Sequence, residues 1–158
     1  MNPKLCCGGE FLIEFYRSPD VLTTIKRPFF LQSVQAGFPS PARDDVEWKD
    51  MDLNELLVER PSSTFFFRTA GNSMIGAGIL DKSILIVDRS IKPRDGMIVL
   101  AVLYGEYTVK YYREIDCKVY LMPANDAFPN IEIRQEMDFS VWGVVTGAVN
   151  QLIRHRKK

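Results

Sequence analysis

A β-hairpin is predicted by residues 96–112, Gly-Met-Ile-Val-Leu-Ala-Val-Leu-Tyr-Gly-Glu-Tyr-Thr-Val-Lys-Tyr-Tyr. Asp95-Gly96 is a turn signal before the first strand, and Tyr104-Gly105 reverses the chain into the second. Both arms are rich in β-branched and aromatic residues, which favour strands. This hairpin indicates antiparallel β structure in the second half of the chain.

The pattern continues on both sides of the hairpin. Short runs of the same character occupy residues 64–69, 83–88, 118–122, 131–133 and 139–145. About seven short strands, spaced by roughly 8–15 residues and with almost no helix between them, are typical of a small barrel or folded sheet. The expected fold class is therefore mostly β, a small folded β-barrel-like domain with an extended N-terminal arm and one short helix.

The first 60 residues are less regular and are interrupted by several prolines. Residues 20–25 are a candidate short strand, while residues 29–34 fit either a strand or one turn of helix. A helix is predicted over residues 50–58, with Asp52 as its N-cap and Glu55 completing a capping box. Its apolar face would consist of Leu53, Leu56 and Leu57.

Composition limits the possible functions. The 158 residues include 20 basic and 20 acidic side chains, so the formal net charge of zero gives no overall signal for nucleic-acid binding. The basic end, residues 154–158, is typical of a solvated tail. Cys6, Cys7 and Cys117 form no disulfide framework and favour a reducing cytoplasm. The apolar run at residues 11–17 is too short and too charged to span a membrane, so we expect a cytoplasmic protein.

A serine in a glycine-rich turn is the strongest chemical candidate. Ser73 lies in Ala70-Gly71-Asn72-Ser73-Met74, where glycine permits another backbone to approach and turn amides can converge on an oxyanion. Such a serine needs a base. The single histidine, His155, lies in the basic tail, which argues against a Ser-His-Asp triad and a histidine-rich metal site.

Lys110 is the alternative base, because an apolar setting lowers the pKa of a lysine by penalising its ammonium form. It lies among Tyr107, Val109, Tyr111 and Tyr112, and strand alternation puts Thr108, Lys110 and Tyr112 on one face. Lys118, by contrast, lies near a turn and is expected to be solvated. From the residues alone, a turn serine and an edge-strand lysine remain the default interpretation, and the Ser-Lys pair is the alternative to it.

A family resemblance adds to this picture. Gly71-Asn72-Ser73-Met74, residues 84–88, the Asp95-Gly96 turn and Gly105–Lys110 resemble the LexA/UmuD family of self-cleaving serine peptidases. Residues 36–42 and 52–57 point to its UmuD-like branch, and Pro123-Ala124-Asn125 with residues 143–145 extend the match. The similarity runs from about residue 29 to about residue 149. The first 28 residues have no clear counterpart, and Asn72 stands where an acidic residue is common.

The resemblance implies a site and a substrate. Ser73 would be the nucleophile and Lys110 the general base, with Ala36-Gly37 as the bond that is cleaved. The backbone amides of Asn72 and Ser73 would stabilise the oxyanion, and no cofactor or metal would be needed. Residues 1–36 would then be an arm removed by self-cleavage, 37–62 a linker with a short helix, 63–150 the Ser-Lys peptidase domain and 151–158 a basic tail.

The resemblance also implies partners. Cleavage would be stimulated by a RecA filament on single-stranded DNA, and the product would act with a Y-family DNA polymerase subunit in DNA-damage-induced (SOS) mutagenesis. A homodimer is expected, without direct sequence-specific DNA binding and without a membrane.

Three other functions compete with this one. A LexA-type repressor would need a helix-turn-helix before the cleavage segment, which residues 1–35 do not suggest. A binding-only module of a polymerase complex would use Ser73 and Lys110 structurally. A signal-peptidase-like Ser-Lys enzyme would need a membrane anchor.

Overall fold

The structure is a computed structural model that describes residues 16–17, 24–31, 33–34, 36–37 and 46–152. Regular structure in this part is mainly strand, with one short α-helix and one 3-10 turn, so the mostly-β prediction is confirmed. No helix in the described ranges is long and apolar enough to cross a membrane.

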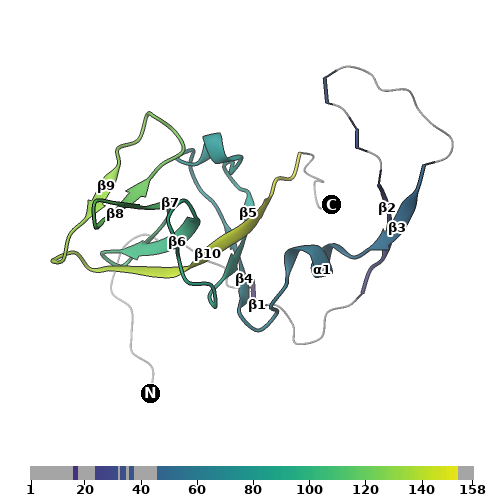
Figure 1. The fold of residues 1–158 in the computed structure, drawn as a ribbon, viewed down its shortest axis with the longest axis horizontal. Coiled ribbons are helices and arrows are strands. Elements are labelled where there is room, and N and C mark those ends of the chain that lie inside the picture. Colours follow the sequence, from purple (N-terminus) through teal and green to yellow (C-terminus); the bar gives the residue numbers. More distant parts are fainter. Residues whose placement is uncertain (1–15, 18–23, 32, 35, 38–45, 153–158) are drawn as a thin grey trace, which may run out of the picture.

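Eight strands form one antiparallel sheet, in the order β1-β4-β5-β10-β6-β7-β8-β9 (Figure 1). They are β1 (Tyr16–Arg17), β4 (Thr64–Arg68), β5 (Ile84–Asp88), β6 (Ile98–Leu103), β7 (Glu106–Ile115), β8 (Lys118–Met122), β9 (Ile131–Ile133) and β10 (Phe139–Val149). Within the described residues the order ends at β1 and β9, so the sheet is folded but is not a closed barrel.

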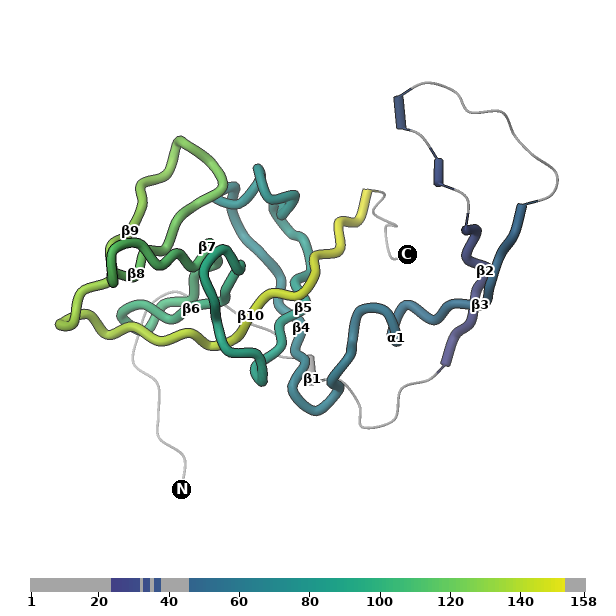
Figure 2. Tube along the Cα trace, in the orientation of Figure 1, coloured from purple at the N-terminus to yellow at the C-terminus, as the bar shows by residue number. Residues whose placement is uncertain are grey.

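Strand β10 joins the two halves of this sheet. Its first part pairs with β6 and its last part with β5, and Val144 pairs with both (Figure 2). The register shifts just before Gly143 and again just before Gly147. A Cβ atom on Gly143 would lie 2.8 Å from Cγ1 of Val87 on β5, so glycine permits this close crossing. The crossing lets Phe67 of β4 approach Tyr107 of β7, with 6.0 Å between ring centroids.

The core is divided between the two faces of β6, as strand alternation requires. Leu100 lies in one cluster, and Val99 and Ala101 lie in the other. The first cluster also contains Phe67, Met74, Ile79, Leu85 and Val87. Because Met74 and Ile79 flank the turn that follows Ser73, this cluster fixes the position of that turn.

Two of the strands that precede β4 in the chain form a separate hairpin. Strands β2 (Arg27–Phe30) and β3 (Trp48–Met51) pair with each other, and Figure 1 shows them standing apart from the large sheet, with the helix α1 (Leu53–Leu57) between the two. Phe29 and Phe30 are therefore in a strand, the first of the two alternatives for residues 29–34. Residues 24 and 25 are not in a strand, and the rest of the candidate strand 20–25 lies outside the described residues.

Helix α1 is shorter than the predicted 50–58, because residues 50 and 51 are held in β3 by pairing with β2. The predicted N-cap is confirmed, since the Asp52 carboxylate accepts from the Asn54 amide at 2.8 Å. The same carboxylate accepts from the Ile25 amide at 2.6 Å, tying the hairpin to the helix. The predicted apolar face is not a buried face: Leu53 and Leu56 are 63% and 56% exposed.

Candidate active site

Ser73 lies in the connection between β4 and β5, immediately before the 3-10 turn η1 (Ile75–Ala77). Gly71 has a φ of +89°, a left-handed conformation that favours glycine, and its amide donates to the Asp81 carboxylate at 3.0 Å. Met74, which is only 3% exposed, anchors the turn in the core. The buried methionine thus leaves the preceding serine side chain at the edge of the core.

A segment after β8 holds this turn from the other side. The Ala124 amide donates to the Ser73 carbonyl at 2.8 Å, and the Gly76 amide donates to the Ala124 carbonyl at 2.8 Å. Asn125 Nδ2 donates to the Asn72 carbonyl at 2.9 Å. From the sequence, Pro123-Ala124-Asn125 is recognisable only as part of a family resemblance, and its role in holding the turn was not predicted. The sole signal was the presence of that block in the family pattern.

Gly76 has no room for a side chain, because a Cβ atom there would lie 2.5 Å from the Ala124 carbonyl oxygen. Gly76→Ala is therefore expected to lower the free energy of unfolding by about 1–3 kcal/mol through overpacking against backbone. Chemical denaturation measures the change. Gly147→Ala is the matched control, because its Cβ would meet mainly the movable tip of Ile86, at 3.2 Å. Equal stability of the Gly76→Ala variant and the wild type would contradict the proposed packing.

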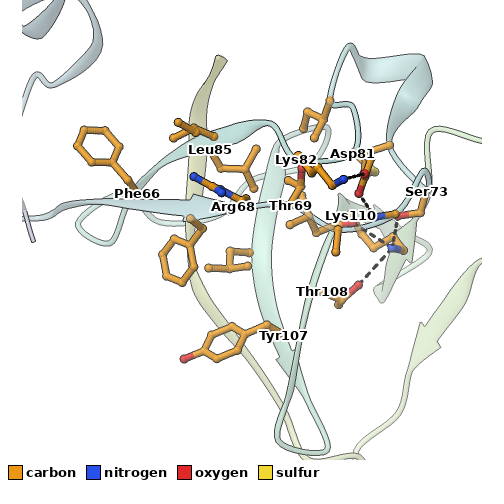
Figure 3. A pocket seen from close by; sticks show the side chains of 18 residues that line it. Phe66, Arg68, Thr69, Ser73, Asp81, Lys82, Leu85, Tyr107, Thr108 and Lys110 are labelled. Atoms are coloured by element: carbon orange, nitrogen blue, oxygen red, sulfur yellow. Dashed lines mark hydrogen bonds and ion pairs between the residues drawn. The ribbon is translucent and has the colours of Figure 1, made fainter. Parts of the chain in front are cut away.

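Lys110 reaches Ser73 from the neighbouring strand β7. Its Nζ lies 2.8 Å from Ser73 Oγ, 3.2 Å from Thr108 Oγ1 and 3.0 Å from the Val109 carbonyl oxygen. Figure 3 shows the three side chains converging, with dashed lines from the lysine nitrogen to the serine and threonine oxygens. The predicted placement of Thr108 and Lys110 on one strand face is confirmed.

Burial changes the acid–base properties of Lys110. The residue is 8% exposed, and this desolvation lowers the pKa of its ammonium below the ordinary 10.5. Among the described residues no carboxylate forms an ion pair with it. Lys118 shows the opposite behaviour: its Nζ lies 2.9 Å from Glu132 Oε1, and this hydrogen bond raises the pKa of the lysine. Lys110 is thus set apart from an ordinary surface lysine.

Ser73 and Lys110 line a cleft of about 1050 Å³. The walls come from β4, β5, β6, β7 and the connection that carries Ser73, and most of the lining is aromatic or aliphatic. In Figure 3 the pair lies at one end of the lining residues and Phe66 at the other. Arg68, Asp81 and Lys82 add charged groups. An apolar cleft with a serine at one end suits an extended peptide.

The two backbone amides predicted to bind an oxyanion are both available. Within the described residues, neither the Asn72 amide nor the Ser73 amide donates to another backbone or side-chain group. The amides of Gly71, Ile75 and Gly76 are all occupied by intramolecular acceptors. Two successive free donors beside a nucleophilic oxygen can stabilise negative charge that develops there.

The predicted cleavage site is not brought to this pair. Ala36 and Gly37 are both exposed, lie in a bend of the connection between β2 and β3, and are not among the residues that line the cleft. Figure 2 shows the described pieces 33–34 and 36–37 apart from the large sheet. The structure therefore brings Ser73 and Lys110 together and leaves the Ala36-Gly37 bond apart from them. No cluster in the described part of the chain could hold a metal ion.

Comparison with known proteins places the chain in a family. The Peptidase S24-like family matches residues 28–146, which include Ser73, Lys110 and Ala36-Gly37. The chain belongs to the Peptidase S24-like family. The match also includes the Ala124–Asn125 segment that holds the serine turn, so the whole site lies within the region shared with other S24-like proteins.

Relatives of this S24-like chain include two with similar length. It is 38% identical over 146 residues to Protein MucA of Salmonella typhimurium, covering 90% of this chain and 95% of MucA. It is 40% identical over 125 residues to Protein ImpA of the same organism, covering 79% of this chain and 84% of ImpA. LexA repressor 2 of Pseudomonas syringae pv. tomato is 35% identical over 107 residues, covering 65% of this chain and 53% of the repressor. UmuD-like membership of the LexA/UmuD family is thereby confirmed.

Proposed function

We propose that this protein is an autocatalytic serine endopeptidase that cleaves its own Ala36-Gly37 bond with a Ser73–Lys110 dyad. The observation that carries the proposal is the 2.8 Å contact between Lys110 Nζ and Ser73 Oγ, made by a lysine that is only 8% exposed. A buried lysine with a lowered pKa and no carboxylate partner in the described structure has a larger neutral fraction at a given pH than an exposed lysine. Its nitrogen lone pair can then accept the serine proton.

The first half of the reaction forms an acyl-enzyme. The neutral amine of Lys110 takes the proton of Ser73 Oγ while that oxygen attacks the carbonyl carbon of Ala36. Negative charge moves onto the Ala36 carbonyl oxygen, where the amides of Asn72 and Ser73 act as donors. When the tetrahedral intermediate collapses, the carbon–nitrogen bond breaks, and the Lys110 ammonium returns the proton to the nitrogen of Gly37.

The second half releases the arm. Lys110 is neutral again and can deprotonate a water molecule, which attacks the ester between Ser73 and Ala36. The products are a new carboxylate at Ala36, a new amine at Gly37 and a free Ser73 hydroxyl. Thr108 Oγ1 and the Val109 carbonyl, at 3.2 and 3.0 Å from Nζ, keep the amine aimed at the serine throughout.

The substrate bond has to travel to the cleft. Because Ala36-Gly37 is exposed and outside the cleft, cleavage requires the hairpin arm to fold back or to enter the cleft of a second copy. Gly37 has open space around its Cα, which allows the backbone to turn at the bond. Either route keeps the bond at a high effective concentration, by tethering or by dimerisation.

The same proposal extends to the biological role. We infer that cleavage is stimulated by a RecA filament on single-stranded DNA, and that the product acts with a Y-family DNA polymerase subunit in SOS mutagenesis in the cytoplasm. Support comes from membership of the family and from similarity to MucA and ImpA over most of their length. A homodimer belongs to this proposal, as do the removable arm 1–36, the linker 37–62, the peptidase domain 63–150 and the basic tail 151–158.

Mapping the products tests the proposed cleavage. Purified protein incubated at pH 9–10 without RecA is expected to yield two fragments, residues 1–36 and 37–158, resolved by intact mass spectrometry. High pH neutralises Lys110 and so replaces the stimulus. Ala36→Trp is expected to slow cleavage strongly, because a large side chain does not suit a narrow pocket beside Ser73. Persistent full-length protein would favour the binding-only module, and a cut at another bond would contradict Ala36-Gly37 as the substrate.

A further inference from the structure

Asn125 is held by hydrogen bonds at both ends of its side-chain amide. Its Nδ2 donates to the Asn72 carbonyl at 2.9 Å, and its Oδ1 accepts from the Ala127 amide at 3.0 Å. A backbone N–H can only donate and a carbonyl can only accept, so these two partners fix which end of the side chain faces Asn72. Asn125 is half-buried and is not among the residues that line the cleft.

The Asn72 carbonyl belongs to the same peptide unit as the Ser73 amide. A trans peptide is planar, so its C=O and N–H point in opposite directions. A donor that binds the Asn72 oxygen from behind the turn therefore turns the Ser73 N–H away from Asn125. Ser73 lines the cleft, and Asn125 does not, so an N–H that is turned away from Asn125 can face the side where a substrate carbonyl would lie.

Little else holds that peptide in place. The other donor to the Asn72 oxygen is the Ile75 amide, at the long distance of 3.4 Å. The next peptide, between Ser73 and Met74, is fixed separately by the Ala124 amide.

We propose that Asn125 is a positioning residue that orients the Ser73 amide as an oxyanion donor, by holding the carbonyl of Asn72 from behind the turn. This inference rests on the proposed peptidase activity. Misaligning one oxyanion donor costs less than deleting it, so we expect a loss of about 10–100-fold in the cleavage rate when Asn125 is replaced.

The test is the full pH–rate profile of self-cleavage for Asn125→Ala and Asn125→Asp. Asn125→Asp keeps the acceptor for the Ala127 amide and replaces the donor to Asn72 by a charged acceptor, so loss of that donor is the change that the two variants share. For Asn125→Ala the rate at high pH is expected to fall about 10–100-fold, while the apparent pKa stays at its wild-type value. An unchanged pKa shows that the burial of Lys110 is intact, which a general loosening of the turn would not preserve.

Asn150 offers a matched control. Its Nδ2 donates to the Gly78 carbonyl at 2.9 Å, on the same connection but beyond η1, and its Oδ1 contacts the Ser83 hydroxyl. Asn150→Ala and Asn150→Asp therefore make the same chemical changes, including the added charge, without touching the Asn72–Ser73 peptide. Both are expected to cleave within about threefold of wild type.

Two results would overturn the inference. One is an Asn125→Ala rate within twofold of wild type; the other is a rate loss accompanied by a raised apparent pKa. If Asn125→Ala does not fold, as judged by circular dichroism, Asn125→Asp alone decides. Failure of the proposed function looks different, because the wild type would then not cleave or Ser73→Ala would still cleave.

Discussion

Ser73→Ala and Lys110→Met are each expected to lower the rate of self-cleavage by about 10⁴-fold or more. The alanine variant removes the attacking oxygen, and the methionine variant keeps an apolar chain of similar length but removes the base 2.8 Å from that oxygen. The two groups act as one unit, so the double variant is expected to be no slower than either single variant. Gel densitometry over days at pH 9–10, with mass spectrometry of the fragments, measures all three rates.

Lys118→Met is the control for this pair of variants. Lys118 is exposed and ion-paired with Glu132, so losing it is expected to leave the cleavage rate within about twofold of wild type. Cleavage at Ala36-Gly37 that survives either Ser73→Ala or Lys110→Met would contradict the assignment of the dyad.

The second large effect is on pH dependence. Only the neutral amine of Lys110 can accept the serine proton, so the cleavage rate is expected to rise about tenfold per pH unit and then level off at the pKa of Lys110. Burial lowers that pKa, so the plateau should begin below the ordinary lysine value of 10.5. The measurement is the first-order rate of fragment formation at half-unit steps from pH 6 to pH 11.

The same shift predicts a change in stability with pH. Between the lowered pKa of folded Lys110 and the ordinary value in the unfolded chain, the unfolded state binds more protons. The contribution of Lys110 to the free energy of unfolding therefore rises with pH through that window, and below the window its buried ammonium is unfavourable. Lys110→Met is expected to be more stable than Ser73→Ala at pH 7, with the difference shrinking at pH 10. A parallel pH dependence in the two variants would count against a lowered pKa.

Most of the sheet could be predicted from the sequence, because the strand signal is local. The predicted strands 118–122 and 131–133 agree with β8 and β9, and the predicted hairpin 96–112 corresponds to β6 and β7. What could not be predicted is the role of β10, which extends to Val149 and changes partner from β6 to β5 near Val144. Partner choice depends on close packing at Gly143, which a single strand does not reveal.

The helix prediction was wrong in its length and in its face. Residues 50 and 51 carry no strand signal of their own and become strand by pairing with β2, a distant segment. Leu53 and Leu56 have helical spacing but remain exposed, whereas Leu57 is half-buried and its Cδ2 would lie 4.0 Å from a Cβ atom on Gly147. Periodicity identifies an apolar face but does not say what covers it.

The pairing of Ser73 with Lys110 could be predicted from the sequence, but the segment that holds the serine turn could not. Residue chemistry made a Ser73–Lys110 pair possible, because the single histidine lies in a tail, and the family resemblance then singled the pair out. The contact of 2.8 Å between them, and the grip of Ala124 and Asn125 on the serine turn, depend on how β7 and the segment after β8 meet that turn. Backbone contacts of this kind do not require particular residue types, except for the glycine at position 76, where a side chain would not fit.

The most direct test is to measure the pKa of Lys110 itself and compare it with the kinetic value. The ¹³Cε and ¹⁵Nζ resonances of Lys110, assigned by comparison with Lys110→Met, can be titrated by NMR in the Ser73→Ala variant, which is not expected to cleave. If Lys110 is the general base, its pKa should lie below 10.5 and within about half a unit of the midpoint of the wild-type pH–rate profile. A Lys110 pKa at or above the ordinary value, with a cleavage rate that levels off at a lower pH, would contradict it.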